Sequence, residues 1–369
     1  MSATTIHPPQ RLLFGPGPTM VEQRVYQAMA QPLVSHMDPY YFEVLADTRR
    51  LLRDLFGTQN EMTLPISGTG SAGMETAVTN FVEPGSKFAV FANGFFCDRL
   101  SEMGKRQDAH VVRLEKPWGE TFTENEAREF LSREKPAVVA FVHAETSTGA
   151  LQNPMAITKA AREIDALVIM DTVTSLGAVP VNVDAVGVDI AYSCSQKGIS
   201  CPPGLAPFTA SPRAMERLKA RTTPMRGWYL DLRLLAEYYD GKKYHHTASA
   251  SLLYGLAEGL RLIAEEGLEQ RFARHVANHE KLVAGLEQQG LTMHVAAGHR
   301  IPNLNTPRVP SGADDAKVRK HLLDHHGIEI AGGFGQLAGK IFRIGLMGPL
   351  SNPDSVALFL RAFHEALSV

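Results

Sequence analysis

The chain has 369 residues, of which 44% are hydrophobic and 21% charged, and its formal net charge is −2. This composition is typical of a globular protein, and the length allows two domains with a large core. The near-zero charge, without a block of basic residues, argues against nucleic acid or an anionic membrane as partner. No apolar stretch approaches the roughly 18 residues that a membrane helix needs.

The cysteine count and the first ten residues bear on location. Residues 1–10 are polar and contain proline, without the basic and apolar regions of a signal peptide. The three cysteines, Cys97, Cys194 and Cys201, form an odd count at no metal-binding spacing. We therefore expect a cytoplasmic protein with reduced cysteines and no metal site.

The first half of the chain predicts an open sheet covered by helices. After the turn Gly15-Pro16-Gly17-Pro18, helical patterns begin near Val21 and again over 40–56. Short apolar runs then alternate with helical stretches such as 72–81, 125–132 and 156–164. The runs cover 62–66, 87–92, 110–114, 137–143, 166–170, 189–193 and 205–209. This alternation predicts an α/β fold with a mostly parallel mixed sheet between helices.

The second half of the chain predicts long helices followed by a smaller α+β unit. Residues 249–289 have helical patterns that are interrupted near Gly267. Strand candidates follow over 327–330 and 340–344, and a closing helix over 354–367. We divide the chain into an N-terminal arm (1–20), a large domain (21–267) and a small C-terminal domain (268–369).

A glycine-rich loop, 67–73, lies between the first apolar run of the sheet and the next helix. Glycines let the backbone approach an anion, helix N–H groups point at it, and Thr69 and Ser71 add hydroxyl donors. The pattern also matches G-x-G-x-x-G, but a dinucleotide site expects an acidic residue at the end of the next strand, where Asn93 stands. The loop therefore predicts a phosphate site and disfavours an NAD-dependent dehydrogenase.

Two of the predicted strands are followed by single charged residues. The run 166–170 ends at Asp171, and Lys197 follows the run 189–193. Carboxyl ends of strands in an open α/β sheet meet at one crevice, so both side chains should face one site. A lysine amine can condense with the aldehyde of pyridoxal phosphate, and an aspartate can keep its ring nitrogen protonated. The alternative for either residue alone is a polar residue at a strand end.

Other side chains extend this site or compete with it. Phe95 and Phe96 follow a strand end and either stack on a ring or pack in the core. Arg343 is a charge inside an apolar strand, where it binds either a substrate carboxylate or an internal Asp or Glu. The histidine pairs 275/279, 245/246 and 325/326 predict solvated faces rather than metal ligands.

In chain order, the motifs resemble those of class V aminotransferases of fold type I, most of all the alanine–glyoxylate and serine–glyoxylate group. They are Gly15-Pro16-Gly17-Pro18, Ser67-Gly68-Thr69-Gly70, Glu145-Thr146-Ser147-Thr148-Gly149, Asp171-Thr172-Val173, Ser195-Gln196-Lys197, Tyr244-His245-His246-Thr247 and Arg343-Ile344-Gly345. The resemblance covers about 11–365. It implies a pyridoxal 5'-phosphate enzyme that moves the amino group of alanine or serine to glyoxylate by a ping-pong mechanism, giving glycine and a 2-keto acid.

The resemblance also implies a role for each matched residue. Lys197 would carry the cofactor and Asp171 would pair with its ring nitrogen. Val173 and Phe96 would cover the ring, and Thr146 would bond its hydroxyl group. The phosphate would be held by Thr69, Gly70, Ser71 and Gln196, and by Tyr244 and Thr247 of a neighbouring subunit in a homodimer with shared active sites. Arg343 would bind the substrate carboxylate, and Gly17 would line the entrance.

Related chemistries remain as alternatives. Transamination of 2-aminoethylphosphonate with pyruvate, or of ureidoglycine with glyoxylate, differs only in the side-chain pocket. Cysteine desulfuration needs a reactive cysteine late in the chain, and none follows Cys201. A silent binding protein is disfavoured because the lysine, the aspartate and the arginine are all present. Small amino and keto acids are the expected ligands, with neither nucleic acid nor membrane as a partner.

Overall fold

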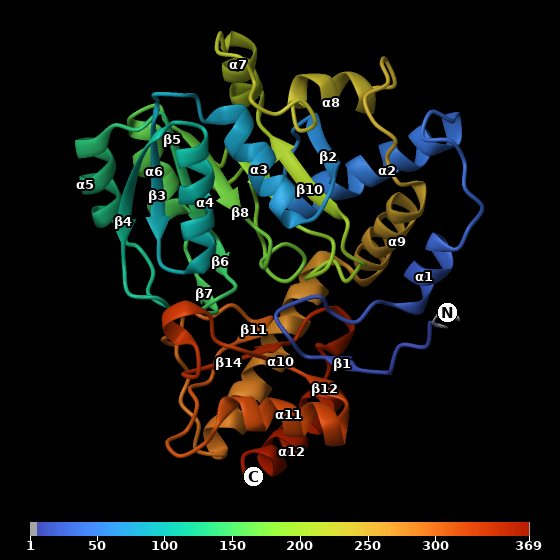
Figure 1. Cartoon of the computed structure of the whole chain (residues 1–369), viewed down its shortest axis with the longest axis vertical. Helices are drawn as coiled ribbons and strands as arrows, with labels where there is room; N and C mark the ends of the chain where they lie inside the picture. Colours follow the sequence, from blue (N-terminus) through green and yellow to red (C-terminus); the bar gives the residue numbers. More distant parts are fainter. Residues whose placement is uncertain (1–5, 369) are drawn as a thin grey trace, which may run out of the picture.

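A seven-stranded sheet is the centre of the larger part of the molecule in the computed structural model, which describes residues 6–368 (Figure 1). The strand order is β2-β10-β9-β8-β5-β3-β4. The strands are β2 (Met62–Ser67), β3 (Lys87–Ala92), β4 (His110–Glu115), β5 (Val138–Val142), β8 (Leu167–Asp171), β9 (Ile190–Tyr192) and β10 (Leu205–Ala210). β10 runs antiparallel to β2 and β9, and the other pairs are parallel. The predicted α/β fold with a mostly parallel mixed sheet is confirmed.

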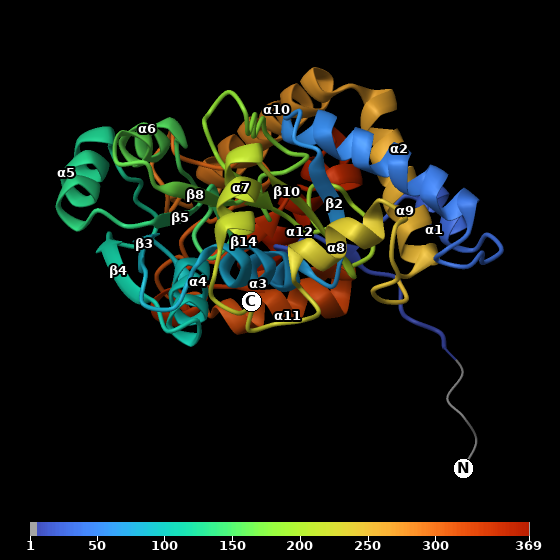
Figure 2. The same ribbon diagram turned by 90° about the horizontal axis from the view of Figure 1, so that it is seen from above.

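Helices cover both faces of this sheet, as Figure 2 shows. Alternate residues of β3 enter separate cores, Phe88 and Val90 on one face and Ala89 and Phe91 on the other. The first core includes residues of α3 (Gly70–Phe81), α4 (Phe95–Arg106), α7 (Pro212–Ala220) and α8 (Leu232–Tyr239). The second includes residues of α5 (Glu124–Glu134) and α6 (Met155–Glu163). Burial on both faces explains why the central strands are continuous apolar runs.

Long helices connect this sheet to the smaller C-terminal part. α2 (Pro39–Phe56) packs against α9 (Ala250–Glu266), and α1 (Gln23–Met29) packs against the same helix. Gly267, at φ 82°, separates α9 from α10 (Leu268–Gln288), so the helices break where the sequence predicts. The three-part domain division remains a prediction, and residues 1–5 of its N-terminal arm lie outside the described residues.

The C-terminal part has its own small sheet and core. β11 (Leu304–Asn305), β14 (Phe342–Gly345) and β13 (Ala331–Gly332) form a sheet in that order, covered by α11 (Asp315–His326) and α12 (Pro353–Ala366). β12 (Ile328–Glu329) is shorter than the predicted strand because Gly327 caps α11, and it pairs with β1 (Leu12–Leu13) of the arm. Short elements complete the chain: β6 (Ala144–Glu145), β7 (Ala150–Leu151), η1 (Gly335–Leu337) and η2 (Gly348–Leu350).

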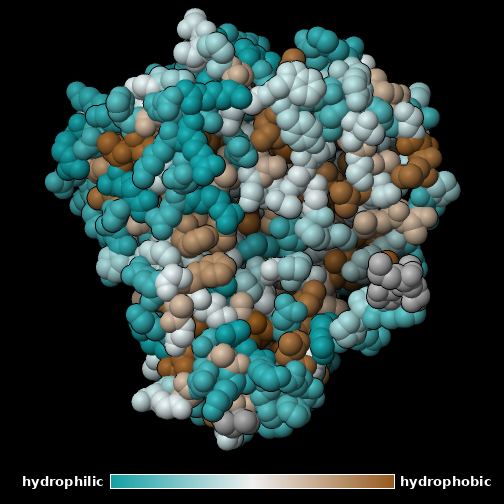
Figure 3. All heavy atoms as spheres, in the orientation of Figure 1, coloured by the Kyte–Doolittle hydropathy of each residue, from teal (hydrophilic) through white to brown (hydrophobic). Residues whose placement is uncertain are grey.

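The surface and the helices agree with the composition. Hydrophilic side chains cover much of the face seen in Figure 3, and hydrophobic side chains appear in patches between them. Within residues 6–368, the structure contains no helix with the length and apolar character that crossing a membrane requires. All three cysteines are buried as free thiols.

Candidate active site

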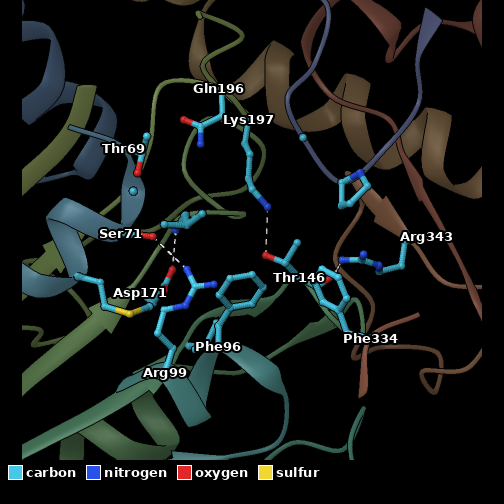
Figure 4. Close-up of a pocket in the computed structure, with 16 residues that line it drawn as sticks. Thr69, Ser71, Phe96, Arg99, Thr146, Asp171, Gln196, Lys197, Phe334 and Arg343 are labelled. Carbon is cyan, nitrogen blue, oxygen red and sulfur yellow. Dashed lines mark hydrogen bonds between the residues drawn. The ribbon is translucent and has the colours of Figure 1, made fainter. Parts of the chain in front are cut away.

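A cavity of about 270 Å³ lies among the sheet, the N-terminal arm and the C-terminal part (Figure 4). It brings together most of the predicted site residues. Its lining consists of Pro16, Gly17, Thr69, Gly70, Ser71, Met74, Phe96, Arg99, Val142, Thr146, Asp171, Val173, Gln196, Lys197, Phe334 and Arg343. Of the residues that the resemblance implies, Tyr244 and Thr247 lie outside this lining.

Asp171, the last residue of β8, is a buried carboxylate that accepts two hydrogen bonds. The backbone N–H of Val173 donates to its Oδ1, and the Tyr192 hydroxyl donates to its Oδ2, both at 2.8 Å. Burial raises the pKa of Asp171 to about 6, although both hydrogen bonds favour the charged form. A partner with a positive charge or an N–H group would stabilise the carboxylate at this position.

Lys197 extends from the loop after β9 into the cavity. Its Nζ donates to Thr146 Oγ1 at 3.1 Å and to Thr174 Oγ1 at 3.4 Å. Burial lowers the pKa of Lys197 to about 8, against the opposing influence of Cys194 and Asp171. A neutral amine is therefore accessible close to physiological pH, and a neutral amine is a nucleophile.

The glycine loop and the start of α3 form the anion-binding end of the cavity. Thr69 is the N-cap of α3, and a Cβ on Gly70 would lie 3.0 Å from the Cβ of Cys194, so the backbone packs tightly there. Arg99 Nη1 donates to Ser71 Oγ at 3.0 Å and adds a positive charge that the sequence motifs did not reveal. Gln196 Oε1 is buried without a hydrogen-bond partner among the described residues. Hydroxyls, helix N–H groups and a cation suit a phosphate.

Phe96 and Val173 both line the cavity, together with Asp171. Phe96 is at the start of α4, next to Phe95. The Arg99 guanidinium lies 4.9 Å from the centre of the Phe96 ring. Figure 4 shows Phe96, Arg99 and Asp171 at the same end of the cavity. The position suits a ring stacked on Phe96.

Arg343 is a nearly buried cation, 3% exposed, in β14. Its Nε donates to the carbonyl of Gly332 at 2.7 Å, and its Nη1 lies 3.4 Å from the carbonyl of Thr146. It forms no ion pair with an Asp or Glu in the part of the chain that the structure describes, so the internal salt bridge is the wrong alternative. Burial lowers the pKa of Arg343 to about 10. A buried guanidinium without an anionic partner is suited to a ligand carboxylate.

Glu145, which no sequence argument singled out individually, connects two elements that border the cavity. Its Oε1 accepts hydrogen bonds from the N–H and the hydroxyl of Ser147, and its Oε2 accepts one from the N–H of Phe96 at 3.2 Å. The side chain is fully buried, and burial raises its pKa. A Cβ on Gly94 would lie 2.2 Å from the Cγ of Glu145, so glycine is required there. The sequence signal that could have indicated Glu145 is an acid that closely follows the apolar run 137–143.

Tyr244 and Thr247 lie outside the cavity lining, and their predicted role toward a neighbouring subunit remains a prediction. Tyr244 is 59% exposed, and its hydroxyl is 3.5 Å from that of Thr247. The residues between them correct the sequence interpretation. His245 and His246 are buried rather than solvated, because His245 stacks on Trp228 and His246 Nε2 lies 2.8 Å from Ser67 Oγ.

The expected solvated face at residues 275 and 279 is also wrong. His275 is fully buried where α10 meets the larger part, with its Nδ1 2.8 Å from the Arg271 carbonyl. His279 is half-buried, with its Nδ1 2.6 Å from Asn305 Oδ1. His325 is exposed as expected, whereas His326 is half-buried with its Nε2 3.4 Å from Glu365. Helical spacing did not reveal the contacts of His279 and His326, because Asn305 and Glu365 lie on other elements.

The sequence profile of class-V aminotransferases matches residues 11–343. The chain belongs to this family. It is 37% identical to the (S)-ureidoglycine–glyoxylate transaminase of Bacillus subtilis, over 97% of this chain and 91% of that protein. It is 36% identical to the alanine–glyoxylate aminotransferase of Oryctolagus cuniculus, over 97% and 93%. The solved structure of alanine–glyoxylate aminotransferase from Nostoc sp. is 45% identical, with a TM-score of 0.98 and coverage of 100% and 98%.

This class V aminotransferase is therefore a transaminase with a fold type I structure, and the family that its motifs indicated is confirmed. Membership of the family implies dependence on pyridoxal phosphate. The cavity fits that group, because a closely packed glycine loop lies at one end, an available lysine amine in the middle and a buried carboxylate beside them.

Proposed function

We propose that the protein transfers the amino group of a small L-amino acid, alanine or serine, to glyoxylate in a ping-pong cycle that yields a 2-keto acid and glycine. The observation that supports this proposal is that Lys197 and Arg343 both contact Thr146. Lys197 Nζ donates to the Thr146 hydroxyl, and Arg343 Nη1 approaches the Thr146 carbonyl. An amine and a guanidinium that contact the same residue suit an α-amino acid and its 2-keto acid, which carry an amino or keto group next to a carboxylate.

Pyridoxal phosphate, when bound, supplies an aldehyde for an amine and a ring that withdraws electrons. Lys197 would carry it, and the Asp171 carboxylate would hold the proton on its ring nitrogen by favouring the cation. Phe96 and Val173 would cover the two faces of the ring. The phosphate would be held by Thr69, Gly70, Ser71 and Gln196, and the ring hydroxyl by Thr146.

Lys197 would also act as the general base. An amine with a pKa of about 8 can both take and return a proton near neutral pH, which is the requirement for moving a proton at the substrate α-carbon. Thr146 and Thr174 hold its Nζ in position. Arg343 would hold the carboxylate of the amino donor and then that of glyoxylate, so one anchor would serve both halves of the cycle.

A homodimer with shared active sites completes the proposal. Tyr244 and Thr247 lie outside the cavity of their own chain, and the exposed Tyr244 side chain is available to a second subunit. Mixing Lys197→Ala protein with Tyr244→Ala/Thr247→Ala protein, followed by subunit exchange, should restore activity because one intact site forms in each mixed dimer. No gain over the two parents would contradict the shared site.

The nearest alternative donor is ureidoglycine. The support for it is the (S)-ureidoglycine–glyoxylate transaminase of Bacillus subtilis, which is 37% identical to this chain. The relative from Oryctolagus cuniculus, at 36%, supports alanine equally well. Glyoxylate as acceptor is common to both, so the proposal differs only in the donor.

A panel of amino acids added to the holoenzyme without acceptor tests the proposal. Alanine or serine should remove the visible absorbance band of the bound cofactor, and glyoxylate should restore it. Borohydride reduction followed by peptide mass analysis should find the cofactor on Lys197, with the Lys197→Ala variant as control. A band that no amino acid changes, or a label on another residue, would overturn the assignment.

A further inference from the structure

The loop between β13 and β14 places an aromatic ring against the carboxylate anchor. The centre of the Phe334 ring lies 3.9 Å from Cζ of Arg343, and Phe334 lines the same cavity (Figure 4). The loop is held by backbone hydrogen bonds from Gly333 to Ile341 and from Leu337 to Phe334. A Cβ on Gly333 would lie 2.0 Å from the Leu337 carbonyl oxygen, so the tight loop depends on glycine there. The ring is therefore positioned by the fold.

This ring lies against one face of the guanidinium, and we place a ligand carboxylate along its edge. Phe334 covers one face of Arg343, and Nε already donates to Gly332. Nη2 makes no hydrogen bond within residues 6–368, and Nη1 makes only the long contact with Thr146. A carboxylate bound along that edge lies beside the Phe334 ring. The α-carbon of the same ligand must then lie between Arg343 and Lys197, which both contact Thr146.

The Phe334 ring presents an apolar surface to the cavity. Its ring is 5.2 Å from that of Phe95, which lies outside the cavity lining, and the rings of Phe95 and Phe96 are 5.5 Å apart. An aromatic ring offers no conventional partner to a polar side chain. A ureido group placed against Phe334 would leave N–H groups unpaired, whereas a methyl group would not. The Phe334 ring therefore favours a short apolar side chain.

The cavity of about 270 Å³ must hold the cofactor as well as the substrate. Phe334 lines this space directly beside Arg343, which would bind the substrate carboxylate.

We propose that Phe334 determines donor specificity: its ring restricts the site to amino and keto acids with side chains of about one or two heavy atoms and disfavours ureido side chains. This inference rests on the proposed function and specifies its donor. Phe334 is 38% exposed, so truncation should enlarge the site without removing a core residue. Leu358 on α12 is also 38% exposed, lies outside the cavity lining and provides a matched control.

The experiment compares holoenzymes of wild type, Phe334→Ala, Phe334→Leu and Leu358→Ala. Calorimetric titration gives dissociation constants for acetate, propionate, butyrate and pentanoate, and turnover with glyoxylate gives kcat/KM for alanine, 2-aminobutyrate and norvaline. One methylene changes discrimination by about 10–200-fold in a hydrophobic pocket. We therefore expect Phe334→Ala to raise the norvaline-to-alanine ratio, and the pentanoate-to-acetate affinity ratio, at least about 10-fold. Phe334→Leu, which keeps apolar bulk, should change both ratios less, and Leu358→Ala neither.

Two outcomes separate the proposals. If Phe334→Ala weakens all carboxylates equally and leaves the ratios unchanged, Phe334 only supports Arg343 and the inference is overturned. If wild-type enzyme transfers no amino group to glyoxylate but the affinity ratio for carboxylates still changes in Phe334→Ala, the size limit stands and the proposed function fails. Phe334→Leu preserves the test if the alanine variant does not fold.

Discussion

At the scale of single residues, the site depends on ionisable groups that burial moves away from their usual pKa values. Asp171 and Lys197 are both buried, and in each the charged form is disfavoured. Arg343 is buried as a cation without an acidic partner among residues 6–368. Buried groups of this kind add little to the stability of the folded chain without a ligand. Strongly shifted pKa values are characteristic of functional sites.

Asp171 allows this to be tested through stability. Its pKa is about 6 in the folded protein against 3.8 ordinarily, so its favourable contribution is complete below about pH 4 and is lost as pH rises through 6. Asparagine cannot ionise, so Asp171→Asn removes this pH dependence. For cofactor-free protein, we compare the free energy of unfolding of the variant with that of wild type at each pH. The difference, variant minus wild type, should be about 1 kcal/mol higher at pH 7.5 than at pH 5.

Urea denaturation at the two pH values measures this difference. The substitution also alters the hydrogen bonds from Val173 and Tyr192, but it does so at both pH values. That effect on stability therefore cancels when the two pH values are compared. The exposed Asp354→Asn variant controls for the removal of one carboxyl group. An effect of the same size at both pH values would show that burial of the charge at position 171 is not the cause.

Arg343→Lys tests the anchor. A lysine keeps the charge but cannot bind a carboxylate through two parallel N–H groups, and it cannot reproduce the flat contact with Phe334. We expect KM for alanine and for glyoxylate to rise about 10–100-fold while kcat changes less. Steady-state kinetics with both substrates measure this effect. Unchanged KM values would exclude Arg343 as the carboxylate anchor.

At the scale of elements, the cavity is assembled by side chains that join one segment to another. Glu145, at the end of β6, accepts hydrogen bonds from Ser147 in the following turn and from Phe96 at the start of α4. The same turn carries Thr146, which contacts Lys197 and Arg343. The buried Glu145 side chain thus fixes the position of Phe96 relative to the turn that carries Thr146.

Glu145→Gln should loosen this junction. A glutamine that still accepts from Ser147 turns its NH₂ group toward the N–H of Phe96, so two donors face each other. We expect a loss of about 1–3 kcal/mol in unfolding free energy and weaker binding of pyridoxal phosphate. Denaturation and cofactor titration measure the two effects, with the exposed Glu163→Gln as control. Lower stability with unchanged cofactor affinity would indicate a purely structural role.

At the scale of the whole molecule, the C-terminal part contacts the loop that carries Lys197. Arg271 of α10 is buried, and it donates to the carbonyls of Gly177 and Gly198 at 2.8 and 2.6 Å. It also pairs with Glu266 at the end of α9, across the break at Gly267. Gly198 directly follows Lys197, so α10 supports the site without lining it.

Arg271→Ala should therefore affect the fold and the site together. It leaves two buried carbonyls without donors, and we expect a loss of about 3 kcal/mol in unfolding free energy. Cofactor affinity should also fall, because the loop of Lys197 loses its support. Chemical denaturation and cofactor titration test both, with the surface variant Arg261→Ala as control. Normal stability would show that the contacts of Arg271 are dispensable.

Much of this protein could be predicted from its amino-acid sequence. Apolar runs located the strands of the large sheet, and single charges after two of them predicted that Asp171 and Lys197 face one site. The structure places both side chains on one cavity, because parallel strands bring their carboxyl ends to one edge of a sheet. The motif order also indicated the class-V family, which the profile match and the relatives confirmed.

The tertiary structure alone decided which distant side chains meet. The contact between Arg343 and Thr146 joins residues 197 positions apart, and nothing local in either segment indicates it. The same holds for Glu145 with Phe96, which are 49 positions apart. Hydrophobic periodicity reports which face of an element is buried, but not what lies opposite, because that depends on how the elements pack. Local sequence patterns therefore predicted Asp171 and Lys197 as candidate site residues, whereas the residues that surround and support them depend on how the elements pack.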